Sequence, residues 1–186
     1  MRVEGVLRLG ANFKKGVCMT TRCLTAFLAL GLTNVASFPA MAQTPAAAQI
    51  TRVLAQWQKA FEAKDLNGVM AVYAPGETLT AYDVVAPLQY KGADAYRKDY
   101  ADFFDQFDGP LHVELRDTHV ETSGNIGFAY GLERISGKLK SGQPVDMWLR
   151  YTSGFKRIGG QWRDVHDHIS VPADMNTGKA LLDLKP

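Results

Sequence analysis

The sequence is poor in cysteine: it has two, Cys18 and Cys23, and both lie near the N-terminus. Beyond residue 23 there is no disulfide and no thiol to act as a nucleophile or a metal ligand. The sequence also lacks a glycine-rich phosphate loop and a G-x-S-x-G segment, which excludes two common nucleotide-binding and hydrolase patterns.

Positive charge is scarce outside the N-terminal region. Of 21 Lys and Arg residues, five lie within residues 1–42, together with Glu4, the only one of 19 acids found there. Removing this segment leaves 16 basic and 18 acidic residues, so the net charge changes from +2 to −2. A slightly acidic domain of this kind favours neither nucleic acid nor an anionic lipid surface as a partner.

Residues 1–42 have the pattern of a secretory signal peptide. A basic start precedes an apolar run over 23–32, and Ala40-Met41-Ala42 provides the small residues of a cleavage site. The run is too short to predict a membrane span, although an uncleaved anchor stays open as an alternative. Met19 is a second candidate start, because a normal basic n-region follows it. We expect a periplasmic or secreted protein without a membrane segment after cleavage.

Helical periodicity follows a flexible N-terminus over 43–48. Apolar residues at intervals of three and four predict a helix from 50 to 64 and a second from 66 to 73. A partly alternating stretch, 77–85, predicts a strand, and 87–91 an edge segment or loop. A third helix is expected over 93–107, after Gly92.

The second half alternates with the period of β-strands. Strands are expected from 111 and over 125–135, where Gly127, Ala129 and Gly131 share one face, so that a large group packs closely there or the strand bends. Gly159-Gly160 predicts a hairpin between two further strands. Residues 174–186 form a polar tail. The order predicts an α+β fold, with three N-terminal helices packed on a curved, mostly antiparallel sheet.

Several short motifs in this order resemble the nuclear transport factor 2-like superfamily, in particular its SnoaL-like and ketosteroid isomerase-like members. The resemblance covers residues 49–173 and implies a cone-shaped fold with a pocket at its open end. The motifs are Trp57…Phe61-x-x-Lys64-Asp65, Val72-Tyr73-Ala74-Pro75, Tyr90-x-Gly92-x-x-Ala95-Tyr96, Arg150-x-Thr152 and Trp162-x-x-x-His166-x-His168-x-Ser170-Val171-Pro172.

Asp83 is the candidate general base that the resemblance implies. In ketosteroid isomerases the base is an Asp on the strand after the second helix, nine residues before a Gly, and Asp83 stands nine residues before Gly92. Partial burial beside Val84 would raise its pKa and suit it to proton transfer. The alternative is a carboxylate at the rim that accepts backbone hydrogen bonds.

The chain departs from the isomerase pattern at the oxyanion hole. That site needs a Tyr on the first helix and a protonated acid on a late strand. Here Trp57 stands at the helix position, and the late strand offers Arg150 and Tyr151 instead of an acid. The same isomerase chemistry is therefore not expected in the same form.

His166 and His168 are candidate acid/base residues on one face of the last strand. The resemblance to kinase association domains instead implies that Ile169, with Asp167 and Val165, faces the pocket. Both histidines would then lie on the outer face, where such domains dimerise. By simple alternation, Asp164 and Ser170 would lie on the histidine face. Both orientations stay open at this point. No motif supplies a third ligand, so neither a metal nor another cofactor is expected.

Arg150 depends on the register of the hairpin. A regular two-residue turn would pair Ser153 with His166, whereas a one-residue bulge would bring Arg150 and Thr152 onto the histidine face. Arg150 would then either anchor a ligand carboxylate or pair with an acid, Asp146 or Asp167. The complete set of candidate binding residues is Trp57, Tyr73, Tyr82, Arg150 and Tyr151.

These features predict an exported domain with an apolar pocket for a small organic ligand. It would act as a cofactor-free isomerase, lyase or hydrolase through the Asp83 base. The alternative is a non-catalytic domain that binds a small ligand or assembles as a homodimer.

Overall fold

The computed structural model describes residues 44–186, which form three α-helices, one 3-10 helix and a six-stranded sheet. The expected signal peptide lies outside the described residues. The helices are α1 (Pro45–Glu62), α2 (Leu66–Met70), η1 (Gly76–Thr78, a 3-10 helix) and α3 (Ala93–Asp105). The strands are β1 (Thr80–Tyr82), β2 (Tyr90–Lys91), β3 (Phe107–Ser123), β4 (Ile126–Leu139), β5 (Pro144–Ile158) and β6 (Gln161–Ser170).

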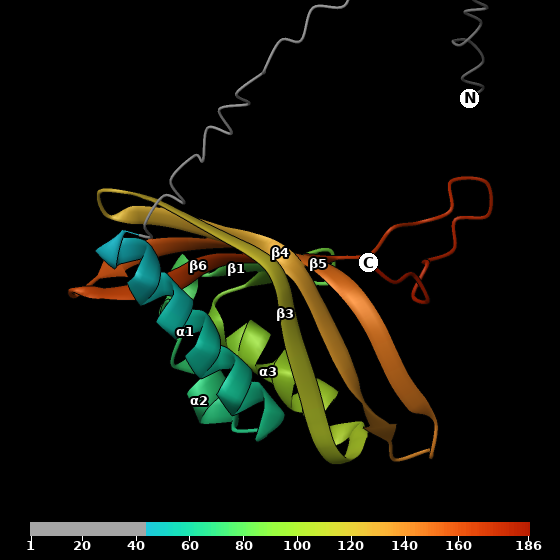
Figure 1. Ribbon diagram of the computed structural model, residues 1–186. Helices are drawn as coiled ribbons and strands as arrows, with labels where there is room; N and C mark the ends of the chain where they lie inside the picture. The colour runs from blue at the N-terminus through green and yellow to red at the C-terminus, as the bar shows by residue number, and fades with distance from the viewer. Residues whose placement is uncertain (1–43) are drawn as a thin grey trace, which may run out of the picture. The chain divides into compact units, whose positions relative to one another are not determined.

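The sheet has the strand order β2-β1-β6-β5-β4-β3. Strand β1 runs parallel to β6, and every other neighbouring pair is antiparallel. The three helices lie on one side of the sheet, and β3, β4 and β5 bend around them (Figure 1). The predicted α+β class, with helices on a curved and mostly antiparallel sheet, is confirmed for this part of the chain.

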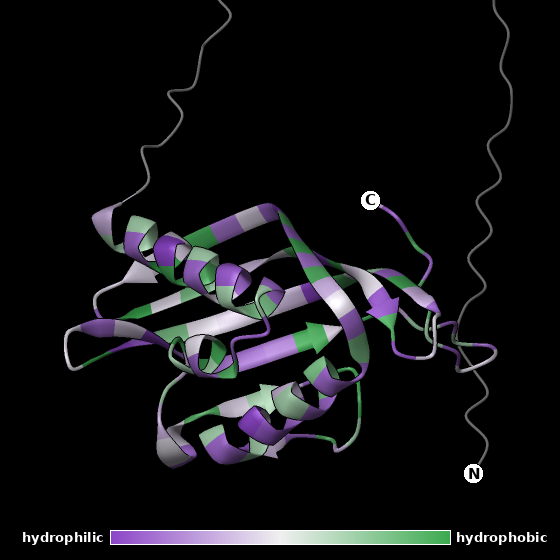
Figure 2. Cartoon of the chain, turned by 90° about the horizontal axis from the view of Figure 1, so that it is seen from below, coloured by the Kyte–Doolittle hydropathy of each residue, from purple (hydrophilic) through white to green (hydrophobic). Residues whose placement is uncertain are grey.

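Helix α1 begins five residues earlier than the periodicity predicts. Thr44 caps it by accepting a hydrogen bond from the Ala47 amide (3.1 Å), and Pro45 occupies a first-turn position that needs no N–H donor. The segment from Pro45 to Ala48, expected to be flexible, is therefore helical. Helix α1 carries both hydrophilic and hydrophobic residues along its length (Figure 2). Its buried stripe comprises Ala47, Ile50, Leu54, Trp57 and Phe61.

The segment after α1 is less regular than expected. Helix α2 ends at Met70, three residues early, because Tyr73 forms a parallel bridge with Asp164 of β6. The expected strand over 77–85 is regular only over Thr80–Tyr82. Pro87 supplies no N–H for a ladder, and the edge strand β2 has only two residues. The chain from residue 83 to 89 consequently lies outside the regular strands, and its first three residues, 83–85, border the interior described below.

The glycine face of β4 combines close packing with a bend, as predicted. A Cβ added to Gly127 would lie 2.5 Å from Cδ1 of Ile50 on α1, and one on Gly131 would lie 2.9 Å from the carbonyl oxygen of Arg116. The β3–β4 register shifts between Arg116 and His119, opposite this part of β4. The glycines thus allow α1 and an irregular β3 to approach the strand.

The β5–β6 hairpin has the two-residue turn predicted from Gly159-Gly160, with positive φ angles of 57° and 80°. A register shift follows, so that Phe155 pairs with Asp164 and Gly154 with His166. This is the register with a one-residue bulge, the second of the two alternatives considered for Arg150. It pairs Thr152 with His168 and so puts Thr152 and Arg150 on the histidine face. The bulge also reverses the expectation for Asp164: extra chain at the bulge puts it on the buried face instead of the histidine face, and it is only 4% exposed.

Among the described helices, none combines the length and the hydropathy needed to cross a bilayer.

Candidate functional site

A cavity of about 640 Å³ lies between the helices and the bent sheet. Its walls come from α1, α3, the segment after β1, the inner faces of β4, β5 and β6, and the C-terminal tail. The walls are mostly apolar and aromatic, as in sites for small organic ligands. The apolar and aromatic residues include Trp57, Phe61, Tyr96, Tyr100, Phe103, Phe107, Ile135, Leu139, Val145, Met147, Leu149, Ile169 and Val171, with Ala180 and Leu182 from the tail.

Glu133 is an acidic side chain on the wall contributed by β4. It is only 4% exposed and lines the cavity, and no hydrogen-bond donor among residues 44–186 reaches its carboxyl group. Burial and the nearby carboxyls of Asp167 and Asp83 raise the pKa of Glu133 to about 8. At neutral pH this group is therefore mainly protonated and can donate a hydrogen bond into the cavity.

Asp83 lines the same cavity from the irregular segment after β1. Its Oδ1 accepts a hydrogen bond from the Val84 amide (2.5 Å). Burial, followed by the like charge of Asp99, raises the pKa of Asp83 to about 6. Asp83 is thus a cavity carboxyl that also has a backbone donor, and it is mainly ionised at pH 7.

Asp99 is a third cavity carboxyl, on α3. Its Oδ1 accepts a hydrogen bond from the Tyr90 hydroxyl (2.7 Å), and burial raises the pKa of Asp99. Tyr90 belongs to β2, so this bond fixes the edge strand to the helix beside Asp83.

Asp167 of β6 lies beneath the cavity in a network of hydroxyl groups. Its Oδ2 accepts hydrogen bonds from Tyr73 (2.9 Å) and Tyr96 (3.0 Å), and its Oδ1 accepts one from Ser153 (3.2 Å). The network continues through Tyr100, whose hydroxyl is 2.6 Å from that of Tyr73. Burial raises the pKa of Asp167, while these three donors oppose the rise.

Trp57 of α1 completes the network from the other side. Its Nε1 donates to the Tyr100 hydroxyl (3.0 Å). Burial raises the pKa of Tyr73, Tyr96 and Tyr100 well above the ordinary value, which keeps these hydroxyls as donors. The structure thus connects the predicted binding residues Trp57 and Tyr73 through a single side chain of α3.

A second cavity, of about 20 Å³, adjoins this network. Tyr151, another predicted binding residue, lines it with Glu133, Asp164 and Asp167, and its hydroxyl is 2.7 Å from that of Thr118. Burial and the neighbouring Asp167 raise the pKa of Asp164 well above its usual range. This space can hold about one water molecule. Tyr151 lines this small cavity and does not line the main one.

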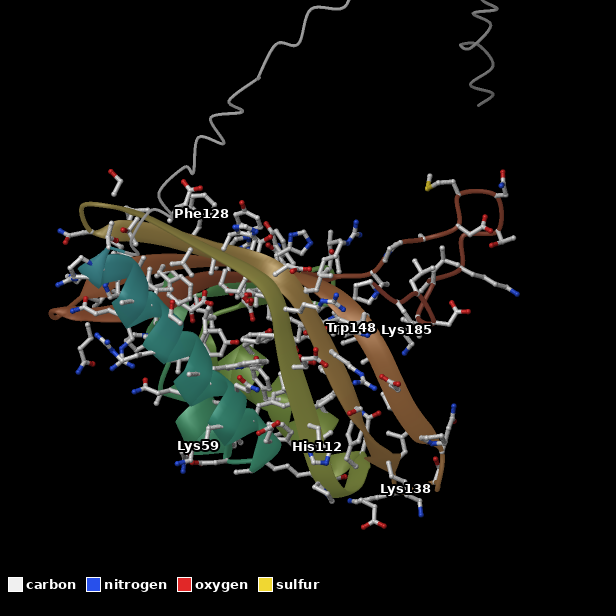
Figure 3. The ribbon with its side chains drawn as sticks, in the orientation of Figure 1. Lys59, His112, Phe128, Lys138, Trp148 and Lys185 are labelled. Atoms are coloured by element: carbon white, nitrogen blue, oxygen red, sulfur yellow. The ribbon has the colours of Figure 1, made fainter. Side chains whose placement is uncertain are left out.

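The two predicted catalytic histidines lie on the other face of the sheet. Directly paired residues share a face, and the pairing joins Tyr82, His168, Thr152, Tyr130 and His119 in one row across five strands. The Tyr82 ring packs edge-on against His166 and His168, at centroid distances of 4.9 and 5.6 Å. His166 Nδ1 also lies 2.9 Å from the Thr80 carbonyl oxygen. Figure 3 shows Phe128 on this outer face of β4, away from the helices.

The structure therefore brings Asp83, Trp57, Tyr73 and Tyr151 toward the interior and leaves out the rest of the predicted set. His166, His168 and Tyr82 lie on the outer face because of the β6 bulge and the parallel β1–β6 pairing. Arg150 is exposed and pairs with Ser170 on that face. Its expected partner Asp146 instead forms ion pairs with Arg134 (2.7 Å) and Lys185 (3.3 Å).

Glu133, Asp99 and the acceptor role of Asp167 were not predicted from the sequence. Glu133 was recognisable in principle, because it continues the face of Gly127, Ala129 and Gly131, where an acid is out of place. Asp99 precedes Tyr100 on the inward side of α3. Within the described residues, no group of three or more His, Asp or Glu side chains is arranged to hold a metal ion.

Comparison with known proteins gives both a family and a fold. The SnoaL-like domain family matches residues 50–174. An NTF2-like protein of unknown function from Pseudomonas putida KT2440 is 34% identical, with a TM-score of 0.68, over 76% of this chain and 96% of that one. No curated protein is similar enough to count as a match.

Two more distant structures share the fold. A ketosteroid isomerase-like protein from Erwinia carotovora atroseptica is 18% identical (TM-score 0.59, covering 68% of this chain and 96% of that one). An NTF2-like superfamily protein from Salmonella enterica is 16% identical (TM-score 0.63, covering 73% and 96%). These two likenesses support the predicted NTF2-like fold. The family match over residues 50–174 and the 34% identical NTF2-like protein show that the chain belongs to the SnoaL-like domain family of the NTF2-like superfamily.

Proposed function

We propose that this domain is a cofactor-free enzyme that moves a proton on a small, mainly apolar carbonyl compound, as an isomerase or a lyase. The observation that carries the proposal is the presence of two cavity carboxyls, Asp83 and Glu133, whose surroundings separate their pKa values to about 6 and about 8. Such a separation is typical of paired acid and base groups in active sites.

Asp83 acts as the general base in this proposal. Its carboxylate removes a proton from the carbon next to the substrate carbonyl. The pKa of about 6 leaves the group mostly ionised at neutral pH while making it a stronger base than an ordinary Asp. Backbone amides of Val84 and Val85 hold the carboxylate in place at the cavity wall, where a substrate can reach it.

Glu133 provides the opposite part of the reaction. As a neutral carboxylic acid it donates a hydrogen bond to the carbonyl oxygen, where negative charge develops as the proton leaves carbon. A donor in an apolar, buried setting stabilises such a charge more strongly than one in water. Return of the proton from Asp83 to another carbon completes an isomerisation. In a dehydration, Asp83 would instead give the proton to a β-hydroxyl group, and the C–O bond would break as water leaves.

The test is turnover of carbonyl compounds by wild type, Asp83→Asn and Asp108→Asn. We would screen 3-oxo steroids and smaller cyclic ketones, including β,γ-unsaturated and β-hydroxy compounds. Loss of the base should lower kcat by about 10²- to 10⁴-fold. Asp108 is exposed on β3, so its substitution should leave kcat unchanged. Equal turnover by wild type and Asp83→Asn would refute the assignment of the base.

We further propose that two copies of the chain associate through the outer face of the sheet. The exposed residues Ile126, Phe128 and Tyr130 lie on β4, and Tyr82 lies at the end of the same face. The same face carries charges of both signs, among them Arg116, Glu121 and Arg150, so a two-fold axis can pair unlike charges around these rings. Sedimentation should show a dimer at micromolar concentration that Phe128→Glu weakens at least tenfold. A wild type that stays monomeric would refute this proposal.

We also propose that the domain acts after export. Fractionation of the source cells should find a mature protein that begins near residue 43 outside the cytoplasm, and a full-length cytoplasmic chain would refute it.

A further inference from the structure

The cavity wall contains acids and no basic side chain. Its acidic residues are Asp83, Asp99, Asp102, Glu133, Asp146 and Asp183, and no Lys, Arg or His lines it. Three cations pair with acids of this wall from outside the cavity: Lys98 pairs with Asp102, and both Arg134 and Lys185 pair with Asp146. An organic anion would therefore meet no counter-charge inside.

Four of the acids form no ion pair in the described part of the chain: Asp83, Asp99, Glu133 and Asp183. Asp83 accepts from the backbone amides of Val84 and Val85, and Asp99 accepts from the Tyr90 hydroxyl. Glu133 has no donor at all, although it is 4% exposed and lines the cavity. Because buried polar groups in proteins are almost always hydrogen-bonded, the partner of this carboxyl has to come from the cavity, where a ligand or a water molecule can supply it.

The remaining wall favours the same sign of charge. Six aromatic rings, those of Trp57, Phe61, Tyr96, Tyr100, Phe103 and Phe107, line the cavity. The face of an aromatic ring is electron-rich and attracts organic cations. Carboxylates form their strongest hydrogen bonds with charged N–H donors. Aromatic faces and unpaired carboxyls together make a site for an apolar body that carries an amine.

We propose that the cavity selects organic cations, namely amines attached to a ring-sized apolar body, and excludes organic anions of the same shape. Asp99 is the partner of the ammonium group, because its second carboxylate oxygen accepts no hydrogen bond from residues 44–186 and it lies near Asp83 without being the base. Glu133 remains available for the carbonyl oxygen. This inference names the substrate class of the function proposed above and rests on it.

Three probes of nearly equal shape test the charge preference without any turnover. They are 2-(aminomethyl)naphthalene, 2-(hydroxymethyl)naphthalene and 2-naphthoate, with binding measured by titration calorimetry at pH 8. The amine should bind at least tenfold more tightly than the alcohol, and the alcohol more tightly than the carboxylate. Binding of naphthoate as tightly as the amine, or an amine no tighter than the alcohol, would overturn the proposal.

Matched variants locate the preference. Asp99→Asn should reduce the advantage of the amine over the alcohol by about tenfold, and Asp94→Asn, which removes an exposed carboxylate from the same helix, should not change it. An unchanged advantage in Asp99→Asn would overturn the role of Asp99. The outcome is separable from the proposed reaction: if Asp83→Asn keeps full turnover while the probe order holds, the reaction fails and the charge selection stands.

Discussion

The interior carboxyls differ in how many donors they have. Asp167 has three hydroxyl donors, Asp83 has the backbone amides of Val84 and Val85, and Glu133 has no donor among residues 44–186. The donors of Asp167 oppose the rise in its pKa that burial causes, whereas no such donor opposes the rise in the pKa of Glu133. Asp167 is therefore a structural acceptor, and Glu133 is free to serve a ligand.

Loss of one donor to Asp167 should destabilise the fold. Tyr96→Phe removes the hydroxyl that donates to Oδ2 while keeping the buried ring. We expect a loss of about 1–2 kcal/mol in the free energy of unfolding, measured by urea denaturation, because a buried acceptor loses a partner. Tyr130→Phe, at an exposed ring on the outer face, should change it by no more than about 0.5 kcal/mol. Equal stability of Tyr96→Phe and wild type would contradict the network.

Glu133 should make stability depend on pH in a defined direction. Its pKa in the folded protein is about 8, above the ordinary value of 4.5, so the folded state holds a proton that the unfolded chain releases. The contribution of this raised pKa to the free energy of unfolding is fully present below about pH 4.5, where both states bind the proton. It decreases as the pH rises and is lost above about pH 8, where the folded state releases the proton as well. Relative to Glu133→Gln, wild type should lose up to about 1.4 kcal/mol per pH unit between pH 5 and 8. Parallel curves for the two proteins would contradict a buried, protonated Glu133.

At the scale of elements, the glycines of β4 decide how near β3 and α1 approach the strand that carries Glu133. Gly131→Ala should cost about 1–3 kcal/mol of unfolding free energy, since its Cβ would lie 2.9 Å from a backbone oxygen that has little room to move. Gly154→Ala on β5 is the control, because its Cβ would meet only ordinary contacts from 3.4 Å. Thermal or urea unfolding measures both, and an unaffected Gly131→Ala would contradict a tight β3–β4 contact at this position.

Elements with strong local patterns were predictable from the sequence, and those that depend on distant partners were not. The Gly159-Gly160 turn and the amphipathic α1 and α3 follow from nearby residues. The bulge near Val165 does not, because it depends on how β5 and β6 pair along their whole length. This one shift decides that Asp164 faces inward while His166 faces outward.

At the scale of the whole molecule, the position of the site could be predicted only in part. Asp83 was found through its spacing from Gly92, and the structure gives it a cavity. Glu133 and Asp99 come from β4 and α3, far from Asp83 in sequence, and only the folded sheet and helix bring them to one wall. A charged residue on an otherwise apolar face was the available signal for Glu133.

The central claim is that one cavity holds an ionised base and a protonated acid at neutral pH. Carbon-detected NMR titration of the side-chain carboxyls, assigned with Asp83→Asn and Glu133→Gln, measures this directly and needs no substrate. We predict midpoints near pH 6 for Asp83 and near pH 8 for Glu133. Midpoints of both groups near pH 4, the ordinary range for carboxyls, would contradict the account.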